Sequence, residues 1–156
     1  MSMNGYFVAV PQPELDALRQ DPEDVSTFLY ETHADHALDV GKAWHGIHFL
    51  LTGTVGGGSG PLDTVVYGRT PLDEEMQYGA VMATDAADVP AIAAALAAAP
   101  DAALRQRFDP DAMDDIYPSA WDEPDALDWL MENLQALRAF YRDAAAAHHA
   151  VVISLD

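Results

Sequence analysis

Two short apolar runs lie near opposite ends of the chain. The first covers Tyr6–Val10 and is ended by Pro11 and Pro13, and the second covers Ala150–Leu155. Short uninterrupted apolar runs are typical of strands that are buried on both faces of a sheet. We therefore predict one core strand near each terminus.

Helical spacing of apolar residues dominates the sequence between these runs. The predicted helices are 14–20, 22–31, 39–53, a helix opened by Asp85 or Asp88 that ends before Pro100, a turn or two over 102–108, and a long helix from Asp122 or Asp125 to about His148. Two further short strands are predicted, an edge strand over 64–67 and a core strand over 79–84. The expected fold class is α+β, a single compact domain over 1–156 with a small mixed sheet of three to four strands and five to six helices.

The predicted helix over 39–53 has the clearest pattern of the chain. Asp39 can cap its first turn, and Gly53 can end it. An apolar stripe recurs at helical intervals, at Val40, Ala43, Trp44, Ile47, Leu50 and Leu51. His45 and His48 lie on the flank of this stripe, and Lys42, the one lysine of the chain, lies on the far side. This helix is the first candidate for a functional site.

Composition narrows the possible partners. The chain has 156 residues, 50% of them hydrophobic, which is enough for one domain with a substantial core. Its 26 acidic and 7 basic residues give a formal net charge of −19. Such a charge opposes binding to nucleic acid and to anionic membranes, and it favours a basic protein as partner. Without cysteine, a signal-like segment or an apolar stretch of about 18 residues, the protein is expected in the cytoplasm.

The histidines form two H-x-x-H pairs, His33 with His36 and His45 with His48. An i, i+3 pair on a helix brings two imidazoles to one side, so each pair is a possible metal site. Neither pair has an evident third ligand, and no H-E-x-x-H motif supplies a catalytic base. We therefore expect no bound metal and no cofactor. The competing explanation is that His45 and His48 form hydrogen bonds inside a packed interface.

The glycine-rich loop over 53–60 does not match a phosphate-binding motif. It lacks the lysine and following serine or threonine of the Walker loop, and it follows a predicted helix rather than a strand. Ser59 within it does not match the pattern of a nucleophile elbow. We interpret this segment as a connecting loop.

Four features occur together in this chain: Leu38–Gly53 with its W-H-x-x-H core, Tyr78-Gly79, Tyr117-Pro118-Ser119-Ala120-Trp121, and the apolar strand at the end of the chain. Together they resemble the YfbM-like family, a bacterial domain of unknown function (1877). The resemblance spans nearly the whole chain. It implies a compact α+β fold in a stand-alone bacterial protein, and it brings no established activity or cofactor.

A candidate pocket follows if the aromatic residues lie against the two histidines. It would contain Lys42, His45, His48, Tyr78, Tyr117 and Trp121. The preferred function is a small binding or protein-interaction module. One alternative is a metal-assisted or histidine-dependent hydrolase that uses His45 and His48, and another is an acidic inhibitor or immunity-type protein that masks a basic partner. The hydrolase requires both histidines in an open cleft, whereas a structural role places them in a closed interface.

Overall fold

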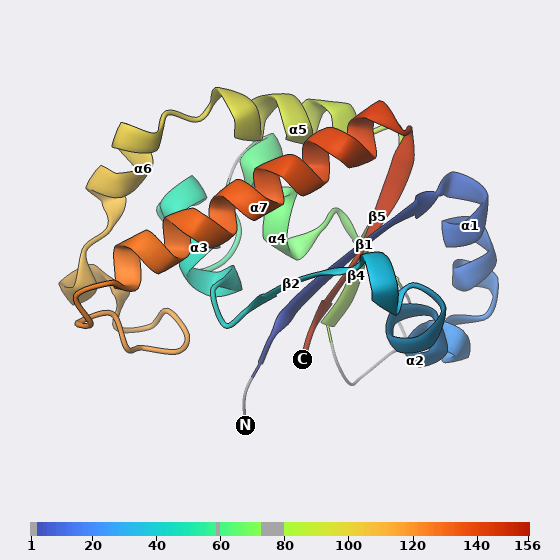
Figure 1. The fold of residues 1–156 in the computed structure, drawn as a ribbon, viewed down its shortest axis with the longest axis horizontal. Helices are drawn as coiled ribbons and strands as arrows, with labels where there is room; N and C mark the ends of the chain where they lie inside the picture. Colours follow the sequence, from blue (N-terminus) through green and yellow to red (C-terminus); the bar gives the residue numbers. More distant parts are fainter. Residues whose placement is uncertain (1–2, 59, 73–79) are drawn as a thin grey trace.

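The computed structural model describes residues 3–58, 60–72 and 80–156. Its centre is one five-stranded sheet in the order β2-β1-β5-β4-β3 (Figure 1). The strands are β1 (Gly5–Pro11), β2 (Leu38–Gly41), β3 (Thr70–Pro71), β4 (Ala80–Thr84) and β5 (His149–Leu155). All neighbouring pairs are antiparallel, so the sheet is not mixed as predicted, and its five strands exceed the three to four expected.

Seven α-helices surround the sheet in the described part of the chain, one or two more than predicted. They are α1 (Gln12–Gln20), α2 (Val25–Thr27), α3 (Trp44–Thr52), α4 (Thr64–Tyr67), α5 (Val89–Ala98), α6 (Asp101–Arg107) and α7 (Ala126–Ala146). The predicted helix over 22–31 is broken into a 3-10 turn, the short α2 and a π turn over Phe28–Thr32. The remaining turns are 3-10 turns at Ala34–His36, Pro61–Asp63 and Pro110–Met113.

The last strand of the chain, β5, lies at the centre of the sheet. It pairs with β1 along its whole length, from Gly5 opposite Leu155 to Pro11 opposite His149, and with β4 on its other side. The two core strands predicted at the termini are thus direct neighbours. Both have helices over both faces, which explains their continuous apolar sequence.

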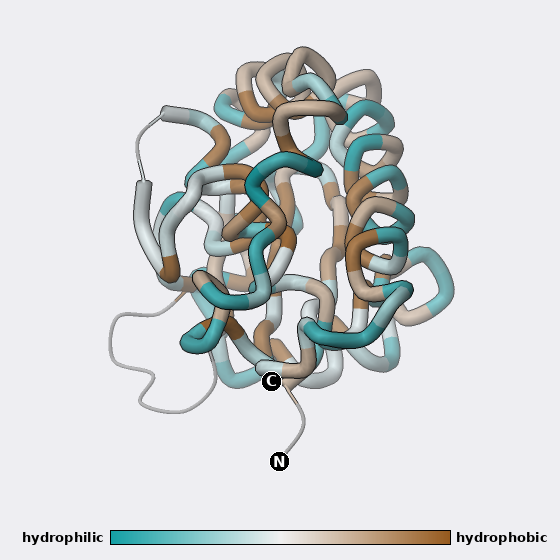
Figure 2. Tube along the Cα trace, turned by 90° about the vertical axis from the view of Figure 1, so that its left-hand side faces the viewer, coloured by the Kyte–Doolittle hydropathy of each residue, from teal (hydrophilic) through white to brown (hydrophobic). Residues whose placement is uncertain are grey.

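The sheet separates two hydrophobic cores. Phe7, Val151 and Ile153 pack on the side of α3, α5 and α7, while Val8 and Val152 pack on the side of α1 and the π turn. Figure 2 shows the hydrophobic residues concentrated in the interior, between the sheet and the helical layers. The long helix α7, predicted from its helical spacing, buries one face that contains Leu130, Leu134, Leu137, Tyr141 and Ala144.

The predicted helix over 39–53 is wrong in its first part. Residues 38–41 form the edge strand β2, and the helix begins only at Trp44. Asp39 does not cap a helix, because its Oδ1 accepts the backbone N–H of Gly41 at 2.7 Å. Gly41 has a φ of 56°, a left-handed conformation that favours glycine and ends the strand. Val40 continued the helical spacing by coincidence, which extended the predicted helix across this turn.

The predicted strand over 64–67 is also wrong. Thr64–Tyr67 form the helical turn α4, which follows the 3-10 turn over Pro61–Asp63. The β-branched residues favoured a strand, but Thr64 Oγ1 donates to the carbonyl of Pro61 at 2.8 Å and stabilises the preceding turn. Val65 and Val66 are both buried, which a half-exposed edge strand would not allow. The edge strand on this side of the sheet is β3, which follows α4.

Candidate functional site

Helix α3 places both histidines of the W-H-x-x-H motif in a buried aromatic cluster. The His45 ring stacks on Trp44 with a centroid separation of 4.8 Å and an interplanar angle of 9°. The rings of Trp44 and Tyr117 also stack, with a centroid separation of 5.9 Å. The rings of His48 and Tyr67 are nearly perpendicular, with a centroid separation of 4.6 Å and an interplanar angle of 79°. The side chains of this cluster come from α3, from α4 and from the segment before α7, so the cluster joins three parts of the helical layer.

Both ring nitrogens of His45 are engaged by the backbone. Nδ1 accepts the N–H of Tyr117 at 2.9 Å, and Nε2 lies 2.7 Å from the carbonyl oxygen of Val55. Because a backbone N–H can only donate and a carbonyl can only accept, the ring must carry its proton on Nε2 and be neutral. Burial lowers the pKa of His45, partly opposed by the bond to Val55. No lone pair of His45 remains for a metal ion or for proton abstraction.

His48 is fully buried and differs from His45 in its partners. Within the described part of the chain, neither of its ring nitrogens makes a hydrogen bond. Burial lowers the pKa of His48. The nearby carbonyl of Gly57 and the charge of Asp63 raise this pKa and so oppose part of the shift. The Gly57 carbonyl is not hydrogen-bonded to the ring, however. His48 is therefore a neutral imidazole that lies in the core.

The other residues of the predicted pocket do not complete one. Tyr117 does lie beside His45, and its hydroxyl accepts the backbone N–H of Met3 at 2.8 Å. Trp121 instead packs over Gly46, and its Nε1 donates to the carbonyl of Ile116 at 2.9 Å. Lys42 is exposed in the turn before α3. Tyr78 lies outside the described residues.

The geometry of the α3 cluster supports a structural role. Both histidines lie in a closed interface, the arrangement expected of structural residues rather than of a hydrolase, but among the described residues only His45 makes the hydrogen bonds expected of both. Sequence reasoning missed Tyr67 as a wall of this cluster, because Tyr67 was assigned to a strand. It also treated Trp44 only as a core residue, although its Nε1 donates to the carbonyl of Met3 at 2.9 Å and ties β1 to α3.

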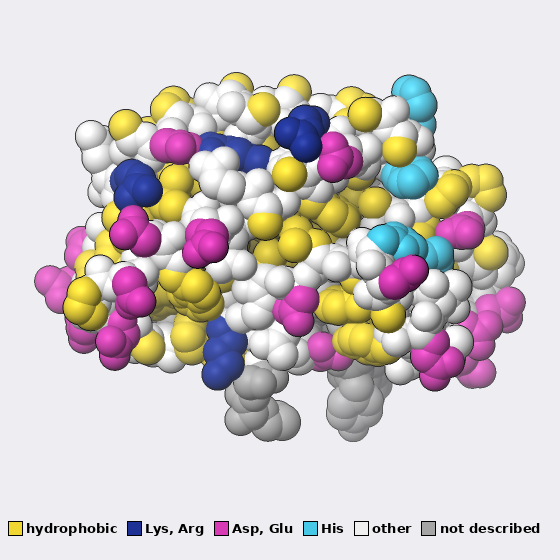
Figure 3. All heavy atoms as spheres, viewed as in Figure 1, with side chains coloured by type: hydrophobic (Ala, Val, Ile, Leu, Met, Phe, Trp, Pro, Cys, Tyr) yellow, Lys and Arg dark blue, Asp and Glu magenta, His cyan; other side chains and the backbone are white. Residues whose placement is uncertain are grey.

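A hollow of about 480 Å³ lies on the opposite side of the sheet, between α1 and the α2 region. Its floor includes Leu18 and Phe28, and its rim carries three carboxylates, Glu14, Asp21 and Asp24. No lysine or arginine is among its lining residues, which also include Ala17, Thr27, Thr32 and His33. In Figure 3, carboxylates gather at the lower right, over α1 and α2, with a second group at the left of the molecule.

The one arginine of α1 does not neutralise this hollow. Arg19 points to the sheet edge, where its guanidinium lies 2.6 Å from Asp85 and donates to Thr70 Oγ1 at 3.3 Å. The hydrogen bonds from Arg19 and Gln12 hold the pKa of Asp85 below its usual range. Burial lowers the pKa of His33, and the nearby charge of Glu14 opposes this. The sequence predicted helices over 14–20 and 22–31, but not that Glu14, Asp21 and Asp24 lie around one hollow.

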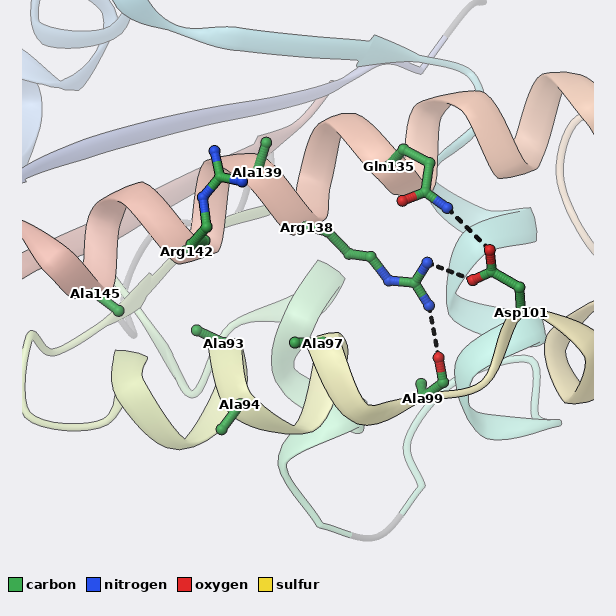
Figure 4. A pocket seen from close by; sticks show the side chains of 10 residues that line it. All are labelled: Ala93, Ala94, Ala97, Ala99, Asp101, Gln135, Arg138, Ala139, Arg142 and Ala145. Carbon is green, nitrogen blue, oxygen red and sulfur yellow. Dashed lines mark hydrogen bonds and ion pairs between the residues drawn. The ribbon is translucent and has the colours of Figure 1, made fainter.

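A second hollow, of about 630 Å³, lies between α5 and α7 and is lined largely by alanines (Figure 4). Its main polar group, Arg138, is already engaged. Arg138 donates to the carbonyls of Leu96 and Ala99, at 3.1 and 2.7 Å, and pairs with Asp101. These contacts satisfy carbonyls at the end of α5 and fasten α5 to α7, so we assign Arg138 a structural role.

No group of three or more histidine or acidic side chains is placed to hold a metal ion within residues 3–58, 60–72 and 80–156. Over the same ranges, no helix has the length and apolar character needed to cross a membrane.

Comparison with known proteins supports the family resemblance. Residues 1–154 match the sequence model of a family described as "Domain of unknown function (DUF1877)". A solved structure of a protein of unknown function, YfbM from Escherichia coli, aligns with a TM-score of 0.82 and 21% sequence identity, covering 99% of this chain and 100% of that one. No curated protein matches the sequence. The fold is thus shared with YfbM, and the chain belongs to the DUF1877 family.

Proposed function

We propose that this protein is a protein-interaction module that binds a basic segment of a partner in the hollow between α1 and α2. The observation that carries the proposal is the combination of an apolar floor, Leu18 and Phe28, with a rim of three carboxylates and no lining cation. A lysine or arginine side chain has the matching form, an apolar stem with a charged head. The stem would pack on Leu18 and Phe28 while the head meets the carboxylates.

The charge around the hollow favours such a partner. Residues 12–36 contain seven carboxylates and one arginine, and that arginine is paired with Asp85. The local field therefore has the same sign as the net charge of −19. Fields of this kind accelerate association with basic proteins and repel acidic ones. A cation placed over the face of Phe28 would add a cation–π contribution of about 0.5–1 kcal/mol at an exposed site.

The inhibitor alternative uses the same surface. An acidic inhibitor or immunity-type protein would also bind its basic target through the hollow, and it differs only in that the target loses activity on binding. The hydrolase alternative gains no support, because both ring nitrogens of His45 are bonded to backbone groups and His48 is buried.

The proposal is tested with two variants of equal charge. Asp21→Lys/Asp24→Lys alters the rim of the hollow, and Asp114→Lys/Asp115→Lys alters exposed carboxylates beyond α6, at the far end of the molecule in Figure 1. The probe is a fluorescent peptide of sequence Leu-Lys-Lys-Leu-Lys-Lys, and binding is measured by anisotropy at 0.1 M salt. None of the four aspartates is buried, so all variants should fold.

The expected result is a loss of peptide affinity of about tenfold or more in the hollow variant and of less than about threefold in the control, since distant charges are screened beyond roughly 10 Å. Equal losses in both variants would show that the peptide senses only the overall charge, and the proposed site would be wrong. Chemical-shift changes in the wild-type protein should map to Ala17, Leu18 and Phe28.

A further inference from the structure

His33 and His36 face each other on the outside of the turn that follows α2. His33 Nδ1 lies 3.1 Å from His36 Nε2. The outer nitrogen of each ring lies near a carboxylate, His33 Nε2 at 3.4 Å from Glu14 Oε2 and His36 Nδ1 at 3.2 Å from Asp35 Oδ1. The order of groups is therefore carboxylate, imidazole, imidazole, carboxylate.

A count of protons shows what this order requires. A carboxylate accepts hydrogen bonds only, so His36 Nδ1, which is hydrogen-bonded to Asp35, carries a proton. The Glu14 carboxylate at 3.4 Å favours a proton on His33 Nε2 as well. With those two protons in place, two neutral imidazoles have both inner nitrogens bare, and their lone pairs would oppose each other at 3.1 Å. The two inner nitrogens therefore have two favourable arrangements. They share one hydrogen bond, which leaves an outer nitrogen bare, or they converge on a cation, which lets both carboxylates face an N–H group.

The ring geometry indicates which kind of cation fits. The two ring centroids are 4.9 Å apart, with an interplanar angle of 85°. An ion roughly 2.0–2.1 Å from both nitrogens would place the centroids about 4.8 Å apart, whereas a collinear N–H···N bond would place them about 5.4 Å apart. The observed separation is close to the value for an ion bound by both nitrogens and shorter than that of a collinear hydrogen bond.

We propose that His33 Nδ1 and His36 Nε2 bind a divalent transition-metal ion of the imidazole-preferring class, Zn²⁺, Ni²⁺ or Cu²⁺. Glu14 and Asp35 orient the rings through the outer N–H groups, the arrangement that carboxylates adopt behind metal-bound histidines. A hollow of about 530 Å³, lined by Glu14, His33, His36 and His149 among others, gives space for the remaining ligands. Those ligands would be water or a donor atom of a bound partner.

Two protein ligands make this an exchangeable site rather than a structural one. Structural zinc sites are closed by four protein ligands, whereas this pair leaves positions open. The site is therefore compatible with purification free of metal, as the sequence led us to expect, and it becomes visible only when metal is added. It does not depend on the proposed peptide binding, although Glu14 and His33 line both hollows.

The test is a calorimetric titration of the full chain with Zn²⁺ and with Ni²⁺ at pH 7.5. His36→Gln removes one ligand from a half-exposed side chain and should not disturb folding. His148→Asn is the control, because His148 is exposed and has a φ of 58°, a conformation that asparagine tolerates. A third variant, Glu14→Gln, keeps both ligands and removes the carboxylate behind His33.

One ion per chain should bind the wild type and His148→Asn with equal affinity, and His36→Gln should weaken binding by at least about tenfold. Glu14→Gln should weaken binding by less than His36→Gln and by no more than about tenfold, the lower end of the cost of losing an orienting carboxylate, because Glu14 is half-exposed and lies 3.4 Å from His33 Nε2. In NMR spectra, Ni²⁺ should broaden the imidazole signals of His33 and His36 first.

Unchanged Zn²⁺ and Ni²⁺ binding in His36→Gln would overturn the proposal and assign any bound ion to the acidic surface. Absence of binding in the wild type would also overturn it and leave a shared proton as the cation between the rings. Mg²⁺ serves as the control for binding to the acidic surface, because it prefers oxygen ligands. Its affinity should be the same for the wild type and for His36→Gln.

Discussion

The Nδ1 atom of His45 accepts the backbone N–H of Tyr117 at 2.9 Å, although the two residues are 72 positions apart. The same ring reaches the carbonyl of Val55 through Nε2. One side chain of α3 therefore satisfies backbone groups of the glycine-rich loop and of the segment before α7. An imidazole does this only when neutral and in one tautomer, which makes the arrangement sensitive both to substitution and to acid.

Replacement of His45 by alanine should destabilise the protein by roughly 2–4 kcal/mol. The change leaves a cavity beside Trp44 and removes the partners of Tyr117 N–H and Val55 C=O. Urea unfolding followed by circular dichroism measures the loss. His148→Ala would be strained by its positive φ, so the exposed His36→Ala is the better control and should change stability by less than about 1 kcal/mol. An equal effect of both substitutions would contradict the assigned role of His45.

Stability should fall between pH 7 and pH 5. Burial lowers the pKa values of His45 and His48 in the folded protein, so below about pH 6.5 the unfolded chain binds more protons than the folded one. The contribution of these neutral rings to stability is complete above the unfolded pKa and is lost as the pH falls toward the lowered folded values. Melting temperatures measured at half-unit pH steps test this. A profile that is flat or rises toward pH 5 would contradict this prediction.

Replacement of His48 by leucine should reduce that pH dependence with little loss of stability. His48 is fully buried and its two nitrogens have no hydrogen-bond partner in the described part of the chain, so an apolar side chain removes a desolvation cost. We expect the free energy of unfolding at pH 7.5 to change by between about −1 and +1 kcal/mol. Between pH 7.5 and pH 5, the variant should lose less stability than the wild type. A loss of more than about 3 kcal/mol at pH 7.5 would indicate that His48 has polar partners.

The sequence predicted correctly those elements in which the apolar pattern and the boundary residues indicate the same secondary structure. The strand over 6–10, the terminal strand and the long helix α7 are all confirmed, because burial on both faces and a 3.6-residue period leave distinct patterns. The errors occurred where a short element had an ambiguous pattern. Val40 fits both a strand and a helix, and only the left-handed Gly41 separates β2 from α3.

The candidate site was less predictable than the fold. The sequence correctly predicted that His45 and His48 lie on one helix, because they are three positions apart. The hydrogen-bond partners of His45, at Val55 and Tyr117, depend on tertiary packing and could not be predicted from local sequence. The acidic hollow also depends on how α1 and α2 meet. Its carboxylates, Glu14, Asp21 and Asp24, looked like ordinary solvated charges because no local pattern joins them.

DNA and RNA should not bind at 0.1 M salt, because the arginines are spread apart and engaged within the protein. Arg107 donates to the carbonyls of Leu50 and Leu51 at the end of α3, both at 2.8 Å, and Arg105 pairs with Asp128. Without a free basic cluster, nothing replaces the counterions on phosphates. Mobility-shift assays with duplex DNA and single-stranded RNA test the prediction. Salt-sensitive binding that is lost in Arg105→Ala would show that a local basic site outweighs the net charge.

Gly46 should be intolerant of even a methyl group. A Cβ at this position would lie 2.6 Å from Cη2 of Trp121 and 2.7 Å from Cδ2 of Leu130, closer than packed carbon atoms allow. Trp121 is held by its hydrogen bond to Ile116, and Leu130 is fully buried in α7, so neither can yield without moving the contact between α3 and α7. Although alanine is the better helix former, we expect Gly46→Ala to destabilise the protein by roughly 1–3 kcal/mol. Gly56→Ala is the matched control, because no atom lies within 4 Å of its added Cβ and its φ is not positive. A gain of stability in Gly46→Ala, as helix propensity alone predicts, would show that α3 and α7 are packed less closely than the structure indicates.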